Sequence, residues 1–322
     1  MTSVLDSPLP STNRSAETAS HQLRSTTAAV RVSFTSFGVR KTLTPAQKAQ
    51  AAEPFGAQEK FLSAGKKLLD TQHPAFRGVT QVRGKIGQYW KSHSLPYPEP
   101  GIRLIRRDFI EPFSQRLEQY REELREAVIG LDQEYGELQR LARRRLGSLY
   151  NPADYPASLQ GWFDVEWEFP SVEPPDYLRR LNPELFRQEQ QRISARLEEA
   201  VQLAEQAFVG ELQQLISHLG ERLSGRQDGT PKIFRDTAVT HLREFFTRFR
   251  DLSIGSQAEF ETLVAQTENL LQGIEPTHLR SDDRLRNRLY SQLRDVEAQL
   301  ATLVIDRPRR KLVRSGGGGE PA

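Results

Sequence analysis

The chain has 322 residues, of which 37% are hydrophobic and 27% are charged, and it contains no cysteine. This apolar share is lower than in a typical globular domain and suits long helices that bury one stripe and leave their other faces in water. The absence of cysteine excludes disulfides and thiolate chemistry, and it is compatible with the reducing cytoplasm, where we expect the protein. No run of about 18 apolar residues occurs, so we expect no transmembrane helix and no membrane partner.

The net charge of +3 is unevenly distributed along the chain. Residues 31–107 contain fourteen Lys and Arg against four Asp and Glu, whereas residues 108–200 contain twelve against nineteen. Either the basic segment packs beside the acidic one within the molecule, or it offers a surface to nucleic acid or another polyanion. Because its excess exceeds what the acidic segment can cancel, we expect an exposed positive face. The candidate residues are Lys66, Lys67, Arg77, Arg83, Lys85 and Lys91.

The N-terminal part of the sequence predicts a tail and then a strand. Residues 1–29 are rich in Ser and Thr and lack apolar periodicity, so we expect them to be disordered. Val30, Val32 and Phe34 then alternate with polar residues, a pattern typical of a short strand.

Two helices are expected next. Thr44 before Pro45 is the N-cap and first-turn pair of a helix over about 45–70, which internal Pro and Gly residues should split. Pro74 opens another helix, which ends before the proline-rich loop 95–101. That loop is either a stiff connector or a docking motif for an aromatic groove.

The most regular pattern is a leucine repeat at seven-residue spacing: Leu117, Leu124, Leu131 and Leu138. It lies in a predicted helix over about 107–146, and an apolar repeat of 3.5 residues keeps one seam facing a partner helix. A second long helix over 182–224 begins with an Asn cap and a proline. We expect these helices to form a long antiparallel, coiled-coil-like hairpin, with pairing between two chains as the alternative.

A second strand is predicted over residues 162–169. Its apolar row, from Phe163 to Phe169, alternates with a row of three carboxylates. Because a lone strand is not stable in water, it needs a partner, and residues 30–40 are the best candidate. Arg31 and Arg40 have the opposite charge to the acidic row, which favours antiparallel pairing.

We therefore predict a mainly α-helical protein with a small two-stranded antiparallel sheet, the long hairpin and a C-terminal helical bundle. Its parts are a disordered tail (1–29), a strand-plus-hairpin domain (30–225), three further helices (226–305) and a basic, Gly-rich tail (306–322).

The sequence shows no motif for catalysis, for a cofactor or for a metal. The six histidines are scattered, without the spacing of a zinc site. The segment Ser63–Lys67 has one glycine and no hydroxyl after its lysine, so it does not form a phosphate loop. The strand carboxylates Asp164, Glu166 and Glu168 could hold a cation, but a solvated or arginine-paired face explains them more simply.

Four motifs resemble an uncharacterised bacterial and phage family, known only as a domain of unknown function. They are Phe37-Gly38-Val39-Arg40-Lys41, Tyr97-Pro98-Glu99-Pro100-Gly101, Arg145-Leu146-Gly147-Ser148-Leu149 and the row Phe163, Val165, Trp167 and Phe169. The resemblance implies helix pairs flanked by strands and supplies no catalytic residues. Members of this kind are often encoded near MoxR-type AAA+ ATPases, so it also implies an adaptor or substrate-side partner of such an ATPase.

We therefore expect a non-catalytic scaffold or adaptor that acts through protein–protein contacts. The alternative is a nucleic-acid-binding accessory protein that uses the basic region 31–107.

Overall fold

The structure is a computed structural model that describes residues 12–224, 237–252 and 258–305. These residues form eleven α-helices and six short strands, which confirms a mainly α-helical protein with a small antiparallel sheet. No helix within the described ranges is both long and apolar enough to cross a membrane.

The chain divides into two compact units. The sheet unit comprises Thr26–Leu95 and Glu99–Gln190, and the helical unit comprises Met1–Ser25, Pro96–Pro98 and Gln191–Ala322. The division therefore falls inside a long helix, at residue 190, and not near the predicted boundary at residue 225.

Strand β1 (Thr27–Thr35) is the shared strand of the larger sheet. It pairs antiparallel with β5 (Ile102–Arg106) on one side and with β6 (Asp164–Glu168) on the other. The β1–β6 pair confirms the predicted antiparallel pairing for residues 31–35, whereas Arg40, also expected to face the acidic row, lies in a separate strand pair opposite Lys67. Arg31 lies opposite Glu168, and its Nη1 donates a hydrogen bond of 2.8 Å to the Glu168 carboxylate.

The larger sheet has four strands in the order β4-β5-β1-β6, with β4 at Leu95–Pro96. The sequence analysis predicted a sheet of only two strands. It missed β5, because this strand directly follows the proline-rich loop and lacks strict alternation. Its Ile102, Leu104 and Ile105 are all buried, so the strand is apolar on both faces.

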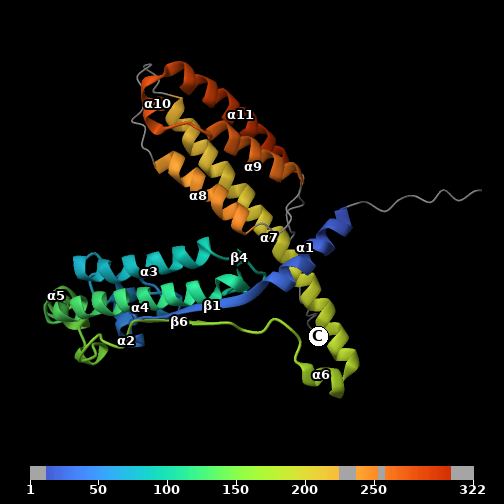
Figure 1. Cartoon of the computed structure of the whole chain (residues 1–322). Coiled ribbons are helices and arrows are strands. Elements are labelled where there is room, and N and C mark those ends of the chain that lie inside the picture. Colours follow the sequence, from blue (N-terminus) through green and yellow to red (C-terminus); the bar gives the residue numbers. More distant parts are fainter. Residues whose placement is uncertain (1–11, 225–236, 253–257, 306–322) are drawn as a thin grey trace, which may run out of the picture. The chain divides into compact units, whose positions relative to one another are not determined.

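The predicted helix over 107–146 is present as two helices. They are α4 (Ile110–Gln133) and α5 (Tyr135–Leu146), with a break at Glu134. Helix α3 (Pro74–Ser92) begins at the predicted proline, and α3 and α4 run side by side next to β1 and β6 (Figure 1).

The leucine seam of α4 is buried, as predicted, but inside the sheet unit. Leu117, Leu124 and Leu131 share one core with apolar residues of α3 and of the sheet. The α3 contribution is a helical stripe of Phe76, Val79, Val82 and Ile86. The predicted hairpin with residues 182–224 is not confirmed, because α3, which carries a matching apolar stripe, covers the seam.

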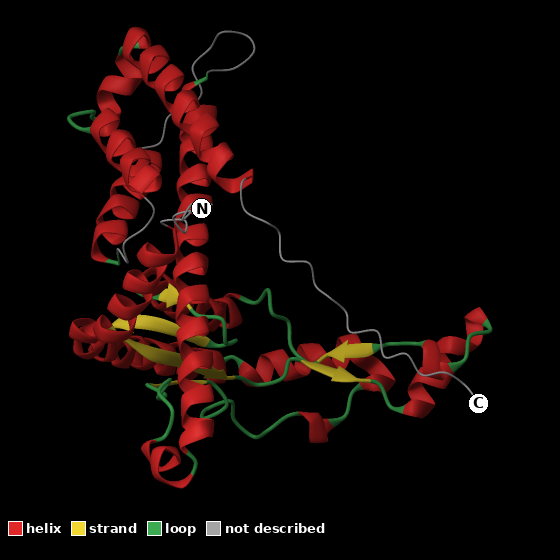
Figure 2. Ribbon diagram, turned by 90° about the vertical axis from the view of Figure 1, so that its right-hand side faces the viewer, coloured by secondary structure: helices red, strands yellow, loops and turns green. Residues whose placement is uncertain are grey.

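A second, two-stranded sheet pairs β2 (Arg40–Thr42) with β3 (Gly65–Lys67). Figure 2 shows the two sheets as separate groups of arrows. Helix α2 (Pro45–Ala52) follows β2, and its predicted Thr44 cap is present as a capping box with Gln47. The helix ends at Ala52, well short of residue 70, because Pro54 and Gly56 stop it.

The prediction that residues 1–29 are disordered is partly wrong. Helix α1 (Thr12–Thr26) precedes β1, and its Ala19 and Leu23 are buried. Their four-residue spacing provides an apolar stripe that the Ser and Thr content obscured. Residues 1–11 and the predicted Gly-rich tail 306–322 lie outside the described residues.

The helical unit is built around aromatic side chains. Helix α7 (Pro183–Leu223) belongs to it from Gln191 on, together with α8 (Thr237–Asp251), α9 (Ala258–Leu271), α10 (Pro276–Ser281) and α11 (Asp283–Ile305). Phe208 of α7 packs edge-on against Phe245 and Phe249 of α8, and Phe249 meets Phe260 of α9. The three helices predicted after residue 225 are therefore confirmed, and α10 is an addition. The short helix α6 (Asp176–Leu181) lies in the sheet unit.

Candidate interaction surface on the β2–β3 arm

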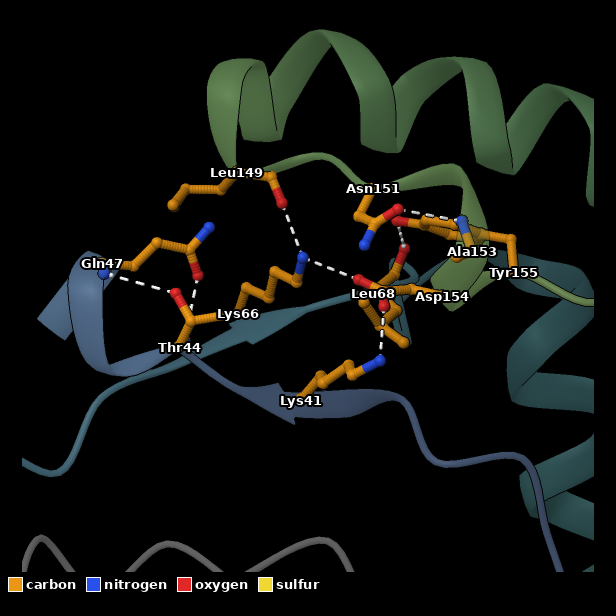
Figure 3. A network of polar contacts seen from close by, with 10 residues as sticks. All are labelled: Lys41, Thr44, Gln47, Lys66, Leu68, Leu149, Asn151, Ala153, Asp154 and Tyr155. Atoms are coloured by element: carbon orange, nitrogen blue, oxygen red, sulfur yellow. Dashed lines mark hydrogen bonds and ion pairs between the residues drawn. The ribbon is translucent and has the colours of Figure 1, made fainter.

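Residues 40–67, here called the arm, run from β2 through α2 to β3 and are held to the rest of the sheet unit by a buried ionic cluster (Figure 3). Lys66 Nζ lies 2.6 Å from Asp154 Oδ2 and donates a hydrogen bond of 2.6 Å to the carbonyl of Leu149. Lys41 Nζ donates a bond of 2.5 Å to the other oxygen, Oδ1, of Asp154. One carboxylate therefore joins both strands of the arm to a distant segment.

Strand register explains why both lysines reach the same carboxylate. Lys41 and Lys66 are directly opposite each other in the antiparallel β2–β3 pair, and opposed residues project from the same face. Lys67, the next residue, is exposed, as the two-residue period of a strand requires.

The segment that follows α5 brings Asp154 to the arm. Gly147 ends α5 with φ at +53°, a conformation that favours glycine. Asn151 then caps the turn Pro152–Asp154 by accepting a hydrogen bond of 3.0 Å from the backbone of Ala153. The Tyr155 hydroxyl donates to the carbonyl of Leu68, just beyond β3, at 3.0 Å.

Burial and charge act on Asp154 in opposite directions. Its side chain is 1% exposed and that of Lys66 is 6% exposed, whereas that of Lys41 is 56% exposed. Burial alone would raise the pKa of Asp154, but the hydrogen bonds and charges of Lys41 and Lys66 outweigh it and hold that pKa below its ordinary value. The cluster is thus an ionised structural anchor.

The part of the arm between α2 and β3 carries two phenylalanines that are exposed to solvent. Phe55 is 82% exposed and Phe61 is 80% exposed, the two highest values among the large apolar side chains that the structure describes. Each is the last residue of one turn of 3₁₀-helix, η1 (Glu53–Phe55) or η2 (Glu59–Phe61).

Backbone contacts fix the shape of both turns. Gly56 has φ at +60° and donates a hydrogen bond of 3.0 Å to the carbonyl of Glu53. Leu62 donates one of 3.0 Å to the carbonyl of Glu59. Two aromatic rings are therefore held outward on short ordered turns.

The six predicted basic residues do not form one exposed face. Lys66 is buried, so its predicted exposure is wrong, because the Asp154 carboxylate compensates its charge inside the unit. Arg83 is half-buried with its guanidinium carbon 5.1 Å from the centre of the Phe34 ring, and Lys85 is 3.2 Å from Glu123 of α4. Lys67 of β3 is exposed, and so are Arg77, Lys85 and Lys91 of α3.

Two of the three carboxylates in the acidic row of β6 are paired with arginines. Asp164 accepts two hydrogen bonds from Arg121, at 2.9 and 2.6 Å, and this contact holds the pKa of Asp164 below its ordinary value. Glu168 pairs with Arg31 across the strands. Within the described ranges, no group of three or more His, Asp or Glu side chains is placed to hold a metal ion.

Sequence reasoning missed the two exposed phenylalanines, since they fell inside the helix predicted over 45–70. The signal was present, because Pro54 and Gly56 interrupt that helix and each phenylalanine stands two residues after a glutamate.

Comparison with protein-family models, with curated proteins and with solved structures finds no match to this chain.

Proposed function

We propose that this protein is a non-catalytic adaptor that binds another protein through the phenylalanines of the arm. The observation that supports it is the exposure of Phe55 and Phe61, at 82% and 80%. Exposed apolar patches mark interaction sites, and these two rings are only six positions apart on the arm. Burying one such ring stabilises a complex by about 1.5–3 kcal/mol, so two rings are enough to form a hot spot.

The anchor of the arm strengthens the proposal. A mobile loop loses conformational freedom when it binds, which weakens the complex. Lys41 and Lys66 join both strands of the arm to the buried Asp154, and Leu43 donates a backbone hydrogen bond of 3.1 Å to Ala64 between the strands. The rings are thus presented from a preorganised base.

The nucleic-acid alternative is less favoured by the same residues. Lys66 is buried, Lys85 is paired with Glu123, and Glu53 and Glu59 next to the rings would repel phosphates. A MoxR-type AAA+ ATPase is the first protein partner to test, on the resemblance described above, and we place the interaction in the cytoplasm.

The test compares the full chain with two double variants in cells that naturally express it. Phe55→Ala/Phe61→Ala removes the proposed contact, whereas Tyr177→Ala/Leu181→Ala removes two other exposed apolar side chains and serves as the matched control. We expect a discrete partner protein whose binding, measured again with purified components, weakens at least tenfold in the first variant only. Equal binding by the first variant and the parent would refute the proposal.

A further inference from the structure

We infer that the partner protein has two apolar pockets, each with a Lys or Arg at its rim. The inference rests on the proposed function and adds the chemistry of the surface that the arm recognises.

The arm repeats one recognition unit twice. Glu53-Pro54-Phe55 and Glu59-Lys60-Phe61 each form a single 3₁₀ turn that begins with a glutamate and ends with an exposed phenylalanine. Because a 3₁₀-helix rises about 2 Å per residue and has three residues per turn, the Cα atoms of the glutamate and the phenylalanine are about 4 Å apart along the axis, and their side chains project about 120° apart around it. The carboxylate is therefore offered to one side of the ring, where the rim of a binding surface can reach it.

The charges of the two turns call for a cationic rim. Glu53 and Glu59 are exposed, and neither carboxylate forms an ion pair with a residue in the described part of the chain. Lys60 is the single basic residue of segment 53–61, and its ammonium lies over the Phe61 ring, 5.2 Å from the ring centre. Two carboxylates against one ammonium repel an anionic surface and attract Lys or Arg.

Arginine suits such a rim best. Its planar guanidinium stacks on an aromatic face and also pairs with a carboxylate through two parallel hydrogen bonds. An arginine at the rim of each pocket therefore has a carboxylate partner on the same turn as the ring.

The spacing of the turns limits the distance between the pockets. Phe61 is six positions after Phe55, so their Cα atoms can be at most about 20–22 Å apart even in a fully extended chain. A backbone hydrogen bond of 3.2 Å from Ala57 to the carbonyl of Ala52 ties the first turn back to α2. Two turns this close along the chain can bind one partner protein, and each then raises the effective concentration of the other.

The first experiment identifies the partner. The photoreactive amino acid p-benzoylphenylalanine replaces Phe55 or Phe61 in the full chain, which keeps an aromatic ring at each position. Irradiation in native cells should crosslink the same single protein from both positions. Crosslinking to nucleic acid, to lipid or to a second copy of this chain would overturn the inference.

The second experiment measures the dissociation constant of the purified crosslinked protein. We expect Glu53→Lys/Glu59→Lys to weaken binding at least tenfold at low salt. The loss should be smaller at about 0.5 M salt, because salt screens the interaction between exposed charges. Glu53→Gln/Glu59→Gln should give an intermediate loss, and Lys60→Gln, the matched control, should keep or improve the parent affinity.

The outcomes separate this inference from the proposed function. If Phe55→Ala/Phe61→Ala abolishes binding while the charge reversal has no effect, the adaptor proposal stands and the cationic rims are refuted. If neither variant changes binding, both are refuted.

Discussion

Replacing Asp154 by Asn should destabilise the sheet unit strongly. The change removes the carboxylate that compensates Lys66, whose side chain is only 6% exposed, and leaves that ammonium with the Leu149 carbonyl. Removing one partner of a buried ion pair typically costs about 3–5 kcal/mol in the free energy of unfolding. Lys41→Met is the matched control, because Lys41 is 56% exposed and an exposed pair is worth at most about 1 kcal/mol.

Urea unfolding followed by tryptophan fluorescence measures this difference. All three tryptophans, Trp90, Trp162 and Trp167, lie in the sheet unit, so the signal reports on that unit. With a slope of about 2 kcal/mol per M, the midpoint should fall by about 2 M in Asp154→Asn and by at most about 0.5 M in Lys41→Met. The apolar pair Asp154→Leu/Lys66→Met should recover much of the loss, because it leaves no buried charge.

The effect should depend on pH in a definite direction. The pKa of Asp154 is lowered in the folded state, so its contribution is present above the ordinary pKa of about 3.9 and is lost as the pH falls through the folded-state value. The difference in the free energy of unfolding between the parent and Asp154→Asn should therefore be largest at pH 7 and should shrink below about pH 4. The role of Asp154 as an anchor would be refuted if the free energy of unfolding of Asp154→Asn were within about 1 kcal/mol of the parent at pH 7. It would also be refuted if the control Lys41→Met lost as much stability as Asp154→Asn.

Two further predictions concern the core and the sheet. Leu124→Ala and Leu131→Ala should each lower the free energy of unfolding by about 2–5 kcal/mol, because both side chains are buried in the α3–α4 core; circular dichroism melts that match the parent would contradict this. A chain that begins at residue 44 lacks β1, which both β5 and β6 need as a neighbour; it should lose packing around Trp167, and unchanged tryptophan fluorescence and proteolysis would argue against the pairing.

The parts of the fold that were predicted carry their signal locally. The β1–β6 pair was found because alternation marked both strands and Arg31 matched the acidic row. The Thr44 cap and the start of α3 at Pro74 were found because helix starts are marked by neighbouring residues. Strand β5 was missed because a strand buried on both faces has no period of two.

Partners distant in sequence were harder to predict. The leucine repeat of α4 indicates that a stripe is buried but not which element covers it, so the covering α3 could not be separated from residues 182–224. The anchor was missed for the same reason. Lys41 and Asp154 are 113 residues apart in the sequence. No local sequence pattern indicates that a lysine such as Lys66 will be buried beside an aspartate.

The central position of β1 has a consequence for synthesis on the ribosome. Arg31 in β1 finds Glu168 in β6 across a separation of 137 residues. At about 5–20 residues per second, β1 therefore waits roughly 7–27 s for its last neighbour to be made. During that time the edge of β1 that pairs with β6 has no neighbour, and an unpaired strand edge is a site for aggregation if translation pauses before residue 168.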